Sequence, residues 1–144
     1  ALVRPQHLSQ LRELLSRYPK MRTVIDHAAK PRIADALFDD WANDIATIAN
    51  ETEAFCKLSG LLTEAGKDWK ATNVDLYVAH LLEHFGPKRL LWGSDWPVLT
   101  LASDYDTWRE LADALIPSER ARAAIFSSSA IDLYRLPERQ LTTS

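Results

Sequence analysis

The stretch Lys88-Arg-Leu-Leu-Trp-Gly-Ser-Asp-Trp-Pro-Val98 decides the fold of this chain. Its apolar run Leu90–Trp92 predicts a short buried strand, and Pro97 prevents the strand from continuing. Asp95 therefore follows the carboxyl end of a strand, which is the edge where parallel α/β folds bind ligands. A carboxylate there can ligate a metal or take a proton from water, although Asp also caps helices and closes turns.

Two further strands are predicted upstream of this stretch, at Arg22–Asp26 and Phe55–Leu58, and Leu2–Val3 predicts the end of another. Apolar residues at helical spacing separate them. Helices are expected at Leu8–Tyr18, Val74–Phe85, Tyr105–Ile116 and Ser118–Phe126. Another helix is expected to begin with Asp39 or Asp40 as its cap and to extend to Ala49. Between them, Leu61–Thr72 is expected to be a long loop, and Ser129 is expected to cap a last short helix that ends near Leu136.

The alternation of strands and helices predicts right-handed βαβ units and a parallel sheet with outer helices, an α/β fold. A complete (β/α)8 TIM barrel takes about 250 residues, whereas this chain has 144. We therefore expect residues 1–144 to form the C-terminal half of such a barrel, about strands five to eight, with a loose tail at 137–144. A small open α/β sheet is the alternative that periodicity leaves open.

Composition narrows the function classes. The chain carries 17 basic and 20 acidic residues, for a formal charge of −3, and has no basic block, so nucleic acid is not an expected partner. No apolar run approaches the length of a membrane span. Cys56 is the only cysteine, which rules out an internal disulfide and is consistent with a reducing, cytoplasmic setting.

His27 and Asp95 form the leading constellation, because each is predicted to follow a strand end at the same edge, with Ser59 beside them. Imidazole and carboxylate both ligate divalent metals and both serve as acids and bases. Two ligands fall short of the three that catalytic zinc takes from a protein. Lys57, Trp96 and Ser59 are candidates for substrate contact. The alternatives are a structural histidine, a lysine that reaches solvent and a tryptophan used for packing.

His80-Leu-Leu-Glu83-His84 matches the H-x-x-E-H pattern of inverted zincins. The apolar face of this predicted helix points away from Glu83 and leaves both histidines on its flank. We therefore interpret the pattern as a chance match on a solvated face.

Three segments carry a family resemblance. They are Val24-Ile-Asp-His27-Ala-Ala-Lys-Pro31, Cys56-Lys-Leu-Ser-Gly-Leu61 with Thr63-Glu64-Ala65, and Arg89-Leu-Leu-Trp-Gly-Ser-Asp-Trp-Pro97. In this order they resemble the amidohydrolase-related family, and most closely its branch of sugar-acid lactonases, which includes L-fuconolactonases and L-rhamnonolactonases. The resemblance begins around strand five of the family's barrel and covers nearly the whole chain.

The resemblance implies a (β/α)8 barrel with its active site at the carboxyl ends of the strands. It implies that His27 is a metal ligand or polarising group, and that Asp95 binds the metal, where one is present, and activates the attacking water. Lys57 falls in the strand-seven motif, beside the substrate pocket. One divalent metal, zinc or similar, is implied, although some branches work without metal. The family's His-x-His is absent from these residues, and Ser129 replaces a common Asn.

The sequence thus predicts a hydrolase that opens a lactone or related cyclic ester of a sugar acid with water activated by Asp95. Its partners would be a small-molecule substrate and the missing N-terminal half of the barrel, and a homo-oligomer stays open. We expect the 144-residue chain to be inactive alone. The alternatives are a decarboxylase on the same scaffold and a non-catalytic fragment or binding module.

Overall fold

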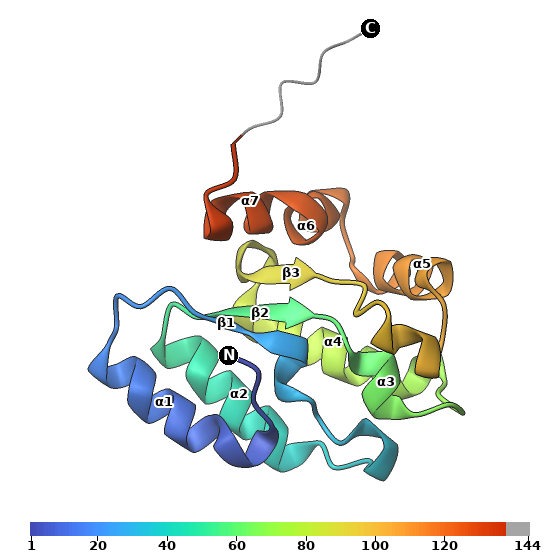
Figure 1. Cartoon of the computed structure of the whole chain (residues 1–144), viewed down its shortest axis with the longest axis horizontal. Coiled ribbons are helices and arrows are strands. Elements are labelled where there is room, and N and C mark those ends of the chain that lie inside the picture. Colours follow the sequence, from blue (N-terminus) through green and yellow to red (C-terminus); the bar gives the residue numbers. More distant parts are fainter. Residues whose placement is uncertain (138–144) are drawn as a thin grey trace, which may run out of the picture.

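A three-stranded parallel sheet organises the chain. The computed structural model describes residues 1–137, with strands β1 (Val24–Ile25), β2 (Phe55–Leu58) and β3 (Leu90–Trp92) in that spatial order. Helices α1 (Leu8–Arg17) and α2 (Asp39–Glu51) lie along one side of the sheet (Figure 1). The strand after α4 (Ala71–Phe85) is β3, and α5 (Tyr105–Leu115), α6 (Glu119–Ala123) and α7 (Ser129–Tyr134) follow.

This arrangement confirms the predicted α/β class with parallel strands and outer helices. Each pair of neighbouring strands is joined by helices, as βαβ units require. Leu2–Val3 does not form the predicted strand end, although the backbone of Ala1 bonds to the backbones of Val24 and Asp26 along the edge of β1. The predicted loose tail, apart from residue 137, lies outside the described residues. Within residues 1–137, no helix combines the length and the apolar character that crossing a bilayer requires.

Three local predictions were wrong. The expected loop at 61–72 contains the short helix α3 (Leu61–Ala65), because Leu61 and Leu62 are fully buried and anchor it against the core. Asp39 and Asp40 form the first turn of α2 instead of its cap, where their charges still favour the positive end of the helix. Ser129 is no cap either, because α6 runs through the π-helical turn Ala124–Ser128 into α7, and Ser129 Oγ donates to Pro87 O at 2.9 Å.

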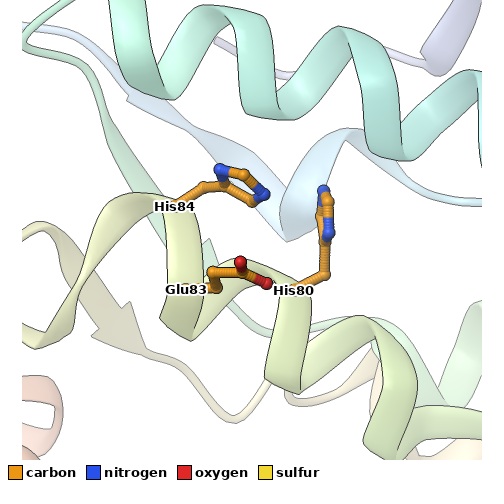
Figure 2. Close-up of side chains that lie close together, drawn as sticks. All are labelled: His80, Glu83 and His84. Carbon is orange, nitrogen blue, oxygen red and sulfur yellow. The ribbon is translucent and has the colours of Figure 1, made fainter.

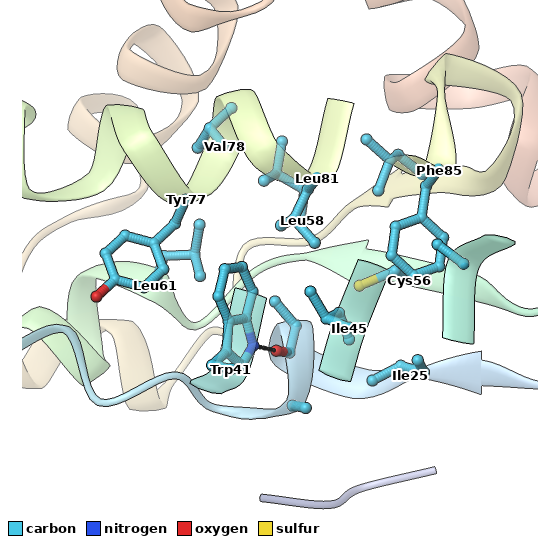
Figure 3. Close-up of a cluster of buried hydrophobic side chains, with 14 of the residues drawn as sticks. Ile25, Trp41, Ile45, Cys56, Leu58, Leu61, Tyr77, Val78, Leu81 and Phe85 are labelled. Carbon is cyan, nitrogen blue, oxygen red and sulfur yellow. Dashed lines mark hydrogen bonds between the residues drawn. The ribbon is translucent and has the colours of Figure 1, made fainter. Parts of the chain in front are cut away.

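One face of the sheet builds the core. Alternate strand residues point to the same face, and the residues with no exposed surface pack against α2 and α4 (Figure 3). They are Ile25, Cys56, Leu58 and Leu90 from the sheet, met by Trp41, Ile45 and Ile48 from α2 and by Tyr77, Val78 and Leu81 from α4. The opposite face carries Phe55 and Lys57, which are only partly buried. In a closed barrel this second face lines the interior.

Arg89 ties the ends of two helices to the sheet. Its Nη1 donates to Thr52 O at 2.9 Å and to Ala54 O at 3.3 Å. Its Nη2 donates to Ala49 O at 2.9 Å and to His84 O at 3.1 Å. Carbonyls near the carboxyl end of a helix lack partners within the helix and attract positive charge. A single guanidinium therefore closes the ends of both α2 and α4.

We expect Arg89→Met to lower the free energy of unfolding by about 3 kcal/mol, because each hydrogen bond from a charged donor contributes about 1.5–3 kcal/mol and several carbonyls lose theirs. The matched control is Arg12→Met, which breaks an exposed pair with Glu51 and is expected to leave the free energy of unfolding nearly unchanged. Urea unfolding of the full-length protein measures both. Equal losses for the two variants would contradict the role given to Arg89.

The sheet also predicts how residues 1–144 behave on their own. Strands β1 and β3 each have one hydrogen-bonded neighbour in the described sheet, and the face with Phe55 lacks the opposing strands of a barrel. We expect this chain to self-associate unless the other half is supplied. Sedimentation velocity of the isolated chain provides the measurement, and a monodisperse monomer with a cooperative thermal melt would show that the sheet needs no further strands.

Candidate active site

Polar residues follow all three strands at the same edge of the sheet. The parallel register pairs Ile25 with Cys56 and Leu58 with Trp92, so the carboxyl ends of the strands lie together. His27 lies two residues beyond β1, Ser59 directly follows β2, and Asp95 lies three residues beyond β3. The structure thus brings together three residues that the sequence placed at one edge.

His27 is held between the other two residues. Its Nδ1 is 2.9 Å from Ser59 Oγ, and its Nε2 is 3.5 Å from Asp95 Oδ1. Thr63 Oγ1 donates to Asp95 Oδ2 at 3.2 Å, so the carboxylate is held from its other side. The Asp95 side chain is 11% exposed and that of His27 is 20% exposed. Each of the two side chains therefore has a neighbour that orients it, and each keeps part of its surface exposed.

Asp26 and Lys57 form an adjacent ion pair. Lys57 Nζ lies 3.0 Å from Asp26 Oδ1. This oxygen is buried and accepts no well-directed hydrogen bond, so the attraction to the lysine charge takes the place of a hydrogen bond. The same oxygen is 4.0 Å from His27 Nε2. Lys57, predicted to contact substrate, is thus already paired. Sequence reasoning missed Asp26, although strand pairing gives a signal. Because Val24 pairs with Phe55, the residues two positions further along each chain, Asp26 and Lys57, fall opposite each other and carry opposite charges.

The backbone around His27 and Asp95 is strained. His27, Ala28, Ala29 and Lys30 have φ values of 49°, 50°, 61° and 53°, and Asp95 has a φ of 61°. The left-handed region costs residues other than glycine roughly 1–2 kcal/mol each. Such strain collects at functional sites and persists where surrounding contacts enforce it. One such contact is buried: Trp41 Nε1 donates to Ala28 O at 2.8 Å (Figure 3).

Trp96, which directly follows Asp95, is far more exposed than the residues of this cluster. Its side chain is 70% exposed, and its backbone N–H donates to Ser94 Oγ at 3.2 Å. Its contact with substrate stays a prediction. A pocket of about 680 Å³ lies elsewhere, where α2 begins, and is lined by residues such as Arg32, Phe38 and Asp44.

The donor atoms of His27 and Asp95 fit one divalent metal. Two ligands of a tetrahedral zinc ion lie about 3.4 Å apart when each bond is about 2.1 Å long, and the Nε2–Oδ1 separation is 3.5 Å. Ser59 on the other ring nitrogen supplies the type of outer partner that fixes a metal-binding imidazole. The chain supplies two ligands of this set, so further ligands would have to come from other residues.

The H-x-x-E-H pattern lies in a different layer, on α4. His80, Glu83 and His84 point toward one another on the helix surface, with Glu83 exposed and the histidines partly buried (Figure 2). This matches the flank position expected from the sequence. His80 Nε2 is 2.9 Å from Ala42 O. Burial lowers the pKa of His80 below its usual value, and the hydrogen bond to Ala42 partly opposes that effect. In the described part of the chain, no hydrogen bond or ion pair joins this group to His27 or Asp95.

Comparison with known proteins shows which proteins this chain is similar to. Residues 1–136 match the amidohydrolase family. L-fucono-1,5-lactonase of Burkholderia ambifaria is 42% identical in an alignment of 143 positions. The alignment covers 94% of this chain and 49% of that protein. L-fucono-1,5-lactonase of Burkholderia multivorans is 34% identical, with 95% and 51% covered. A Burkholderia multivorans amidohydrolase, crystallised with bound zinc, matches at a TM-score of 0.87 and 33% identity, covering 95% of this chain and 52% of the other.

The chain spans about half the length of the curated relatives it matches, which agrees with the predicted half-barrel. A 2,6-dihydroxybenzoate decarboxylase also matches, at a TM-score of 0.58 and 16% identity, a likeness that shows a shared fold alone. The family match extends over all three strand-end motifs quoted from the sequence, from His27 to Asp95. The chain belongs to the amidohydrolase family.

Proposed function

We propose that the full-length protein hydrolyses a lactone of a sugar acid at the His27–Asp95 pair. The observation that carries this proposal is the 3.5 Å separation of the imidazole Nε2 and the carboxylate at the strand-end edge. The two relatives named L-fucono-1,5-lactonase support the choice of a sugar lactone as substrate. Because the chain spans about half of each relative, residues outside it would complete the site.

In this reaction Asp95 takes a proton from a water molecule, and the water oxygen attacks the ring carbonyl carbon of the lactone. The bond between that carbon and the ring oxygen then breaks, and the proton held by Asp95 passes to the departing ring oxygen. The product is the open hydroxy acid. Ser59 holds the imidazole of His27 in place, and Thr63 does the same for the Asp95 carboxylate.

His27 and Asp95 are the residues of this chain that would hold a divalent metal, with zinc the first candidate. A bound metal polarises the carbonyl and makes water more acidic. Without metal, His27 itself would polarise the carbonyl. Lys57, Ser59 and Trp96 are the proposed substrate contacts, and in this role the Lys57–Asp26 pair presents a positive charge to the substrate hydroxyls. The lone, buried Cys56 is consistent with a cytoplasmic enzyme.

The alternative of a decarboxylase has only fold-level support, since the matching decarboxylase is 16% identical. The two activities differ in their products. Lactone hydrolysis releases a proton and no carbon dioxide, whereas decarboxylation of an aromatic acid releases carbon dioxide. Incubating the full-length protein with L-fucono-1,5-lactone and, separately, with 2,6-dihydroxybenzoate distinguishes them. Carbon dioxide release without lactone opening would overturn the proposal.

Gly60 gives the positioning of His27 a direct test. A Cβ added to Gly60 would lie 2.9 Å from His27 Cβ and 3.0 Å from His27 Nδ1, and its φ of 70° disfavours a side chain. Gly66 has a φ of 85° and nothing within 4 Å of an added Cβ. Both alanine variants therefore strain the backbone, but only one displaces the imidazole.

We expect Gly60→Ala to lower kcat on the order of 10²-fold, the size of effect that a displacement of about 1 Å produces in an active site. Gly66→Ala should lose stability but keep most of its kcat. Steady-state lactone hydrolysis and thermal melts of both variants provide the measurement. A kcat that is lowered equally in both would attribute the effect to backbone strain instead of to His27.

We expect Asp95→Asn to fold normally and to lose on the order of 10²-fold or more in kcat, because the amide accepts a hydrogen bond but no proton. KM should change less, since the substrate contacts remain. A pH-indicator assay of lactone hydrolysis, with a melt of each protein, measures this. If the variant retains its melt and most of its kcat, Asp95 is a structural residue and another group activates the water.

A further inference from the structure

The group of His80, Glu83 and His84 on α4 has no part in the proposed reaction. Residues three and four positions apart share one face of a helix, which explains why the three side chains meet. One ligand atom from each side chain lies within 4.8 Å of those of the other two. Figure 2 shows the ring of His84 turned toward His80, with the Glu83 carboxylate beside both.

His80 is held in one orientation by the helices around it. Its ring packs against Phe38 and Trp41, with centroid distances of 5.4 and 5.5 Å. Its Nε2 lies 2.9 Å from Ala42 O, and a carbonyl can only accept, so this nitrogen carries the proton. The lone pair of His80 is therefore on Nδ1. A backbone carbonyl that fixes the far nitrogen is the usual outer partner of a metal-binding histidine.

We propose that His80 Nδ1, the His84 imidazole and the Glu83 carboxylate bind one divalent transition-metal ion. Two imidazoles and a carboxylate suit Zn²⁺, Cu²⁺ or Ni²⁺, whereas Mg²⁺ and Ca²⁺ select oxygen ligands. Glu83 is exposed and His84 is only partly buried, so both can rotate to shorten the 4.8 Å spread around an ion. Water would complete the coordination.

The position of the group indicates what such an ion does. It lies where α4 packs against α2, and the His80–Ala42 hydrogen bond crosses between these helices. An ion on Nδ1 keeps the proton on Nε2 and so strengthens this link. Because an ion that binds the folded chain stabilises it by mass action, we assign the site a stabilising role. This replaces the interpretation of the pattern as a chance match, and still gives it no zincin chemistry.

The test is a Zn²⁺ titration of the chelator-stripped full-length protein against a colorimetric zinc chelator, with Zn²⁺ alone as the probe. The variants are His84→Ala and Glu83→Gln, neither of which touches the His80–Ala42 link. The control for removing a histidine is His7→Ala, because His7 is exposed and lies outside this group; its Nδ1 accepts from the backbone N–H of Arg4, so this variant is compared through its zinc binding and not through its melt without zinc. His27 and Asp95 are unchanged in every protein, so zinc bound there contributes equally throughout.

We expect wild type and His7→Ala to bind one more Zn²⁺ than His84→Ala, and Glu83→Gln to bind that ion at least about tenfold more weakly, the loss that even an outer partner causes. Added Zn²⁺ should raise the Tm of wild type and His7→Ala more than that of His84→Ala. Equal Zn²⁺ stoichiometry and an equal zinc-induced Tm shift in wild type and His84→Ala would overturn the proposal.

Discussion

Parallel pairing of three short strands is the constraint on which the rest of the structure depends. Because β1, β2 and β3 run in the same direction in fixed register, every residue that follows a strand emerges at the same edge. A slip of one residue would turn Lys57 into the core and Cys56 out of it. The complete burial of Ile25, Cys56 and Leu90 against α2 and α4 opposes that slip. The geometry of the candidate site at the strand ends is thus a consequence of core packing on the face of the sheet that meets α2 and α4.

Much of this could be predicted from sequence, because short apolar runs bounded by Gly and Pro mark strands clearly. His27, Ser59 and Asp95 could be placed at one edge by counting strands alone. The Asp26–Lys57 pair and the Thr63 contact could not, since they depend on exact register and on the turn of α3. The left-handed turn at 27–30 was equally hidden, because Ala28 and Ala29 have no intrinsic preference for positive φ. Buried tertiary contacts such as Trp41 to Ala28 impose it.

The helical layer has its own polar links, and these carry no signal in hydrophobic periodicity. Arg89 closes the ends of α2 and α4, and His80 joins the middle of α4 to Ala42 in α2. In both links a side chain donates a hydrogen bond to a backbone carbonyl. Such bonds fix how α2 and α4 pack against each other, which apolar contacts alone would specify less well. Because α2 connects β1 to β2, links that hold α2 and α4 in place also help to keep these two strands in register. That register holds His27 against Ser59.

The central claim is that His27 and Asp95 act together on a lactone carbonyl. A crystal structure of the full-length protein with an unreactive sugar lactam bound tests it most directly. The account predicts that the ring carbonyl carbon lies beside the His27–Asp95 pair, with about 3–3.5 Å between that carbon and the oxygen of a water molecule held by Asp95. A lactam bound elsewhere, with its carbonyl out of reach of any oxygen held by Asp95, would contradict the account.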